Sequence, residues 1–224
     1  MSSEARKAVD PLGSALALAV AFGGVVYGVL FVLVARGTTD AVFRTWLVVG
    51  IIGGLVAAGV FAALYERLKG TNATLALWAV AVGVVGSLGQ TLNASVTLGY
   101  DVTGTSGDTP DPLGMLRFGL TGFALILFGL VMSRDRSIPK NLATLGVVAG
   151  ALLILSYVGR IAGFITPATK ATLIPPLLYG LVIHPLFYFW LARLLVGTSR
   201  EHLRELLLGP GLGRRLGAAP RTRQ

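Results

Sequence analysis

Long uncharged apolar runs alternate with short polar segments along the chain, and this alternation indicates the class of fold. Six runs are each long enough to cross a bilayer as a helix, which takes about 20 residues. They cover residues 14–34, 45–65, 75–96, 116–132, 142–164 and 173–196. The pattern predicts an all-α, polytopic membrane protein with six transmembrane helices.

Composition agrees with this prediction. Of the 224 residues, 54% are apolar and 13% are charged, about half the charged share of a soluble domain. The first run is too long for a signal peptide and follows residues of both charge signs, so we expect it to be retained as a span. There is no cysteine, which excludes disulfides and thiolate metal sites. We expect no metal site, and no motif names a cofactor.

Basic residues gather on one side of the predicted spans. With the N-terminus inside the cell, fourteen of the 19 lysines and arginines are assigned to the cytoplasmic side, including Arg193 near the end of the sixth run. Four are assigned to the outer side, including Arg117 at the start of the fourth run, and Arg160 lies inside the fifth run. This asymmetry predicts a multi-pass plasma (inner) membrane protein with both termini in the cytoplasm. Because topology accounts for the net charge of +9, we expect no nucleic-acid partner.

A different pattern follows the sixth span. Thr198 and Glu201 have the spacing of a capping box, and the leucines after them fall on one helical face. We therefore predict a short C-terminal amphipathic helix on the inner leaflet, followed by a basic tail. The expected organisation is a six-helix transmembrane domain over 1–197 and this cytoplasmic helix and tail over 198–224.

Polar residues are few inside the spans. Placing each of them in lipid costs free energy, so each is a candidate for function. In the third span, Gln90 and Asn93 extend a stripe of small and polar residues expected to face the bundle interior. Tyr157 and Arg160 share a face of the fifth span, and Tyr179 lies in the sixth. The predicted orientation places all five in the outer half, where they would form a ligand-binding pocket if the three helices touch.

Arg160 has no acidic partner within any span. It could snorkel to the outer interface or pair with Asp40 or Asp101 at the span ends. Alternatively, it could face a ligand and hold an anionic or carbonyl group.

His184 precedes Pro185 in the sixth span. Proline lacks an N–H and leaves the Leu181 carbonyl without its usual partner, so we expect a kink there. A structural hydrogen bond across the bundle is the favoured role for His184; haem ligation and proton transfer are the alternatives.

Two stretches, "FRTWLVVGIIGGLVAAGVFAALYERLKGTNATLALWAVAVGVVGSLGQTLNAS" (43–95) and "LILFGLVMSRDRSIPKNLATLGVVAGALLILSYV" (125–158), carry a family resemblance. In hydropathy and loop spacing, residues 12–196 resemble a family of six-span bacterial inner-membrane proteins of unknown function. The segment 100–114 departs from it. The resemblance implies a six-helix plasma-membrane protein and supplies no catalytic residues.

The favoured hypothesis is a non-enzymatic membrane protein that binds a lipid-like, amphipathic ligand, or serves as accessory subunit to another membrane protein. In the ligand-binding form, Gln90 and Asn93 exchange hydrogen bonds with the ligand and Arg160 holds its polar end. In the accessory form, these residues satisfy one another. The alternatives are a transporter of small solutes or lipids with a hinge at Pro185 and, third, an intramembrane enzyme.

Overall fold

The computed structural model describes residues 3–104, 112–162 and 177–196, and within these ranges it leaves out the side chains of 3–10, 112–115 and 160. The predicted amphipathic helix and the tail over 198–224 lie outside the described residues. So do the ends of the fifth and sixth predicted spans, at 163–164 and 173–176.

Six helices make up the described chain, and all six are long and apolar enough to cross a membrane. Five are α1 (Ser3–Ala35), α2 (Asp40–Leu68), α3 (Ala73–Thr103), α4 (Pro112–Arg134) and α5 (Lys140–Ile161). The sixth helix has the candidate span Tyr179–Val196. After two α-helical residues, 177 and 178, it forms the π-helical turn η2 (Tyr179–Ile183) and then continues as an α-helix. The predicted all-α class with six membrane-spanning helices is confirmed, whereas the orientation of the termini stays a prediction.

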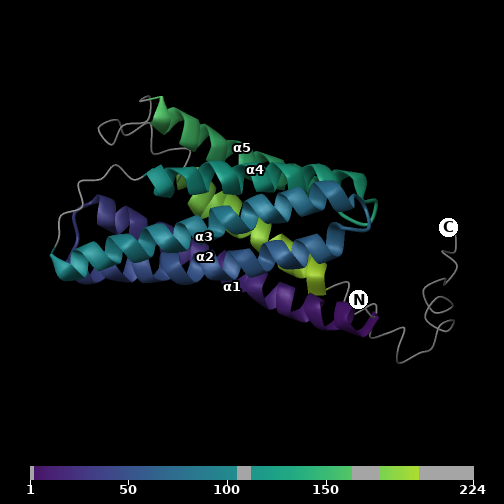
Figure 1. The fold of residues 1–224 in the computed structure, drawn as a ribbon, viewed down its shortest axis with the longest axis horizontal. Helices are drawn as coiled ribbons and strands as arrows, with labels where there is room; N and C mark the ends of the chain where they lie inside the picture. The colour runs from purple at the N-terminus through teal and green to yellow at the C-terminus, as the bar shows by residue number, and fades with distance from the viewer. Residues whose placement is uncertain (1–2, 105–111, 163–176, 197–224) are drawn as a thin grey trace, which may run out of the picture.

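The helices lie side by side, and neighbours in sequence are neighbours in space (Figure 1). From α1 to α5 each helix packs against the next one, running the opposite way. The sixth helix returns to contact both α1 and α5. As a result α4 lies between α3 and α5, and the sixth helix closes the bundle.

Each end of the bundle carries an ion pair that ties two helices or loops together. At one end, Arg44 of α2 donates from Nε to Asp101 Oδ2 of α3 at 2.6 Å. At the other, Arg67 Nη1 of α2 lies 3.3 Å from Asp135 Oδ2 in the turn between α4 and α5. We call these the Asp101 end and the Asp135 end; the Asp101 end is on the left in Figure 1.

The apolar core is concentrated in the half of the bundle towards the Asp135 end. Phe61 of α2 and Phe128 of α4 stack there at a centroid distance of 5.7 Å. Around them lie fully buried side chains from four helices: Leu64, Leu68, Val131, Met132, Leu142, Leu191 and Leu195. Large apolar side chains fill this half closely. The polar residues predicted to carry function lie in the opposite half.

Small residues let the helices approach closely. A Cβ on Gly54 of α2 would lie 2.6 Å from the Ser87 carbonyl oxygen of α3. On α4, a Cβ on Gly122 would lie 2.7 Å from the carbonyl oxygen of Gly150. Both contacts are backbone against backbone, so only glycine fits without a shift of the helices.

Candidate functional site

Gln90 and Asn93 lie on α3 in the half of the bundle towards the Asp101 end. A Cβ on Gly50 of α2 would lie 2.8 Å from Gln90 Nε2 and 3.2 Å from the Tyr27 ring of α1. The Gln90 amide therefore fills the space above a glycine, beside two other helices. Asn93 follows one turn later, and both side chains are half-buried. The predicted polar stripe of α3 does face its neighbours.

Arg117 and Tyr157 lie at the same height on the next two helices. A Cβ on Gly89 of α3 would lie 3.8 Å from the Arg117 Cβ on α4. Two residues further along α4, a Cβ on Gly119 would lie 2.9 Å from the Tyr157 ring of α5. Because adjacent helices are antiparallel, these contacts bring Gln90, Arg117 and Tyr157 to one depth. We call Gln90, Asn93, Arg117 and Tyr157 the polar level.

The polar groups of this level are unpaired within the described chain. The side chains of Gln90, Asn93 and Tyr157 make no hydrogen bond to any described residue, and their polar atoms remain accessible. Elsewhere in α3 the hydroxyls of Ser95 and Thr97 donate to the carbonyls of the preceding turn, at 2.8 and 2.9 Å. A polar group in a span normally finds such a partner. The polar level therefore presents donors and acceptors that no described residue uses.

Arg160 lies in the last turn of α5, and its side chain is outside what the structure describes. Its backbone position is three residues beyond Tyr157 and so close in height to Arg117. Of the two acids considered as its partners, Asp101 is engaged by Arg44. Asp40 lies in the first turn of α2 and is exposed.

Tyr179, the fifth predicted ligand-binding residue, lies at the start of the sixth helix. It contacts the ring of His184 edge-on, at a centroid distance of 5.4 Å. Because α4 packs against both α3 and α5, it lies between them. Because α3 packs against neither α5 nor the turn η2 of the sixth helix, the condition for the predicted pocket, that these three helices touch, is not met. Gln90 and Asn93 lie at the same height as Tyr157 but on the other side of α4, while Tyr179 belongs to a separate aromatic group with His184.

His184 packs directly on the backbone of α1. A Cβ on Gly24 would overlap Nδ1 and Cε1 of its imidazole, and Tyr188 lies against its ring at 4.6 Å. Nδ1 is enclosed and makes no hydrogen bond. In place of the expected hydrogen bond across the bundle, the described contacts of His184 are aromatic and steric.

Just before Pro185 the sixth helix widens into the π-turn Tyr179–Ile183, while the kink itself stays a prediction. The amide of His184 donates to the Tyr179 carbonyl, five residues back. Widening the turn in this way accommodates the missing N–H and the bulk of the proline ring.

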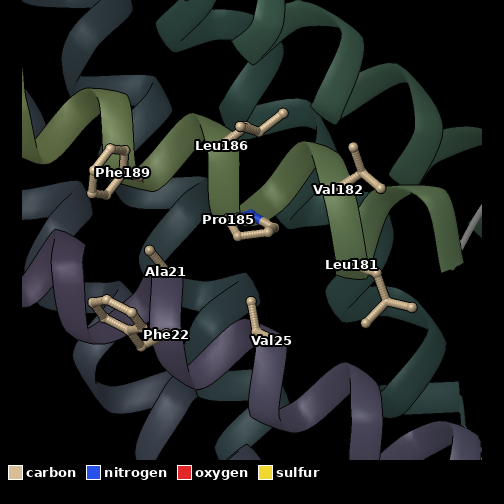
Figure 2. Close-up of a pocket in the computed structure, with 8 residues that line it drawn as sticks. All are labelled: Ala21, Phe22, Val25, Leu181, Val182, Pro185, Leu186 and Phe189. Atoms are coloured by element: carbon tan, nitrogen blue, oxygen red, sulfur yellow. The ribbon is translucent and has the colours of Figure 1, made fainter.

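An apolar groove of about 410 Å³ runs between α1 and the sixth helix. Figure 2 shows Phe22 and Phe189 at one end, Leu181 at the other and Pro185 between them. Its remaining lining residues are Ala21, Val25, Val182 and Leu186. No side chain that lines it carries a polar group, so the groove offers shape but no chemical recognition.

Arg117 is the functional candidate that sequence reasoning missed. The distribution of basic residues assigns it to the outer flank of the fourth span, although it falls one residue inside the span Leu116–Arg134. The signal that could have found it is the same as for Arg160: a cation inside an apolar run.

The six apolar helices indicate a multi-pass membrane protein. No family model, curated protein or solved structure matches the chain. The resemblance to a six-span bacterial family therefore stays a prediction.

Proposed function

We propose that this chain is a non-enzymatic integral membrane protein that binds an amphipathic, lipid-like molecule at the polar level. One observation carries the proposal. The polar atoms of Gln90, Asn93 and Tyr157 lie in membrane-spanning helices, remain accessible, and have no partner within the described protein.

The physical reason is the cost of an unpaired polar group in hydrocarbon, which amounts to several kcal/mol. An amphiphile with a carbonyl or hydroxyl group removes this cost, because an amide both donates and accepts and a phenol does the same.

The accessory-subunit hypothesis is less well supported. It predicts that the polar residues satisfy one another, but no hydrogen bond joins Gln90, Asn93 and Tyr157. Transport would require a polar path towards the Asp135 end. In the described part of that half, the buried side chains are mainly apolar: the exceptions are Ser14, whose hydroxyl donates to the Ala192 carbonyl at 3.1 Å, and the phenol of Tyr188. These two groups do not form a continuous polar path.

Native mass spectrometry of the gently extracted protein tests the proposal. We expect the wild type to retain an amphiphile and the double variant Gln90→Leu/Asn93→Leu to lose it, because leucine keeps the volume but removes the hydrogen bonds. Ser95→Ala is the matched control: it removes a polar group from the same helix, but one already bonded to the backbone.

Thermal unfolding of the three proteins in detergent establishes that each is folded. A wild type that carries no amphiphile would contradict the proposal. A folded double variant that carries as much amphiphile as the wild type would contradict it too.

A further inference from the structure

Arg117 adds a charge to the polar level. Its side chain is half-buried on α4, and its Nε is enclosed without a hydrogen-bond partner. The guanidinium lies over the ring of the adjacent Phe118, with Cζ 4.6 Å from the centroid. No described residue forms an ion pair or hydrogen bond with it. An aromatic face offsets only part of the cost of a cation that cannot be deprotonated.

The described carboxylates do not compensate this charge. Asp101 is held by Arg44, Asp135 and Glu66 lie at the opposite end with Arg67 and Lys69, and Asp40 is exposed at the start of α2. A cation within a span is expected to face a cavity, a partner or an anionic ligand.

A second cationic residue lies at a similar height on the adjacent helix. The contact between Gly119 and Tyr157 sets the register of α4 against α5. Arg117 is two residues from that contact on α4 and Arg160 is three residues from it on α5. At a rise of about 1.5 Å per residue, the two backbones differ little in depth. Arg160 is therefore a second basic residue at this height of the bundle.

We infer that the polar level is specific for a phosphate-bearing anion, with the terminal amino groups of Arg117 as its main contact. This inference rests on the proposed function, because it names the charged group of the same ligand. A guanidinium fork matches two phosphate oxygens at once. The terminal amino groups are available for this contact, since only Nε is enclosed. Gln90 and Asn93 supply amide N–H groups at the same level.

Phosphate of this kind reaches a membrane protein as the headgroup of an anionic phospholipid or as a free ion. Two lipids with identical acyl chains distinguish binding of the headgroup charge from binding of the acyl chains. They are phosphatidylglycerol and a monoglucosyl diacylglycerol that lacks phosphate. The protein is reconstituted in an equal mixture of both, extracted gently and weighed by native mass spectrometry. In a separate arm, inorganic phosphate is added to the detergent-solubilised protein and thermal unfolding is measured.

For the wild type we expect phosphatidylglycerol to be retained over the glycolipid by about tenfold, the size of one hydrogen-bonded charge contact. Arg117→Gln removes this preference but keeps the glycolipid, and Arg117→Lys restores part of it. Arg36→Gln is the matched control, because it removes the same charge from an exposed position at the same end and leaves the preference unchanged. Thermal unfolding of each variant verifies that it is folded.

A shift of the unfolding temperature by inorganic phosphate, present in the wild type and absent in Arg117→Gln, identifies the free ion as a source; without it, the source is the lipid headgroup. Retention of both lipids in equal amounts with no phosphate shift overturns the inference and leaves the proposed function standing. An unchanged preference in Arg117→Gln also overturns it. A wild type that retains neither lipid overturns the proposed function itself.

Discussion

Gly23 and Gly24 are adjacent on α1 but have opposite surroundings. A Cβ on Gly24 would overlap the His184 imidazole, whereas a Cβ on Gly23 would meet nothing within 4 Å. In the sequence both are glycines in an apolar run, but only Gly24 has a second glycine, Gly28, four residues later, which is a spacing typical of close helix contacts. That spacing predicts close packing but not the partner, because the partner depends on which helix returns to α1.

Gly24→Ala is expected to destabilise the protein by about 1–3 kcal/mol, since the added methyl overpacks the contact with His184. Gly23→Ala is expected to be neutral or to stabilise by up to about 1 kcal/mol through helix propensity. Thermal unfolding in detergent measures both.

Combining Gly24→Ala with His184→Ala frees the space, so the penalty of the glycine substitution shrinks in that background. If Gly23→Ala and Gly24→Ala changed the stability equally, His184 would not pack on α1 as described.

At the scale of the elements, Asp135 joins two helix connections at one end of the bundle. Its Oδ1 accepts from the amide and hydroxyl of Ser137 at 2.8 and 2.7 Å, and its Oδ2 accepts from Arg67 and Thr71, both at 3.3 Å. Partial burial raises the pKa of this carboxyl, but the bonds from Ser137, the charge of Arg67 and the bond from Thr71 together lower it below its usual value.

The direction of this pKa shift determines how the stability of the fold depends on pH. A carboxyl whose pKa is lower in the folded state stabilises the fold above its unfolded pKa of about 3.9, and the effect is lost as the pH falls through the folded pKa. At pH 7, Asp135→Asn is expected to cost about 1–3 kcal/mol. Between pH 7 and about pH 3 the wild type loses more stability than the variant, so the two curves converge.

Unfolding temperatures measured across this range test the expectation, with Ser137→Ala as an intermediate case, because it removes one of the four bonds. Parallel curves for wild type and Asp135→Asn would mean that the carboxyl is not held as described.

The elements themselves were predictable to different degrees. The six spans follow from the length of the apolar runs, but helices extend beyond them: α3 reaches Thr103, seven residues past the predicted end at 96. There the hydroxyls of Thr97 and Thr103 donate to carbonyls of the preceding turn, so polar residues continue the helix. The π-turn was not predictable, since proline indicates a distortion without specifying its form. Likewise, the height of Arg117 beside Gln90 depends on helix register, which local patterns do not contain.

At the scale of the whole molecule, the two halves of the bundle differ. The half towards the Asp135 end is filled by large apolar side chains, and the half towards the Asp101 end contains the polar level. The distribution of basic residues predicts that the Asp101 end faces outward. In that orientation the polar level would lie within the outer leaflet.

Single-cysteine labelling tests this orientation without background, because the chain has no cysteine of its own. Thr38→Cys, exposed at the Asp101 end, should react with a membrane-impermeant maleimide in intact cells. Arg136→Cys, exposed at the Asp135 end, should react only after the membrane is permeabilised. The reverse pattern would place the polar level in the inner leaflet.

The central claim is that an amphiphile occupies the polar level, and lipid cross-linking in the native membrane tests it most directly. A phospholipid with a photoreactive diazirine near its glycerol is activated by light, and the modified peptides are identified by mass spectrometry. The account predicts that modification concentrates on α3 around Gln90 and Asn93, on α4 around Arg117 and on α5 around Tyr157. Modification confined to the apolar groove between α1 and the sixth helix, or spread evenly over the lipid-facing surface, would contradict it.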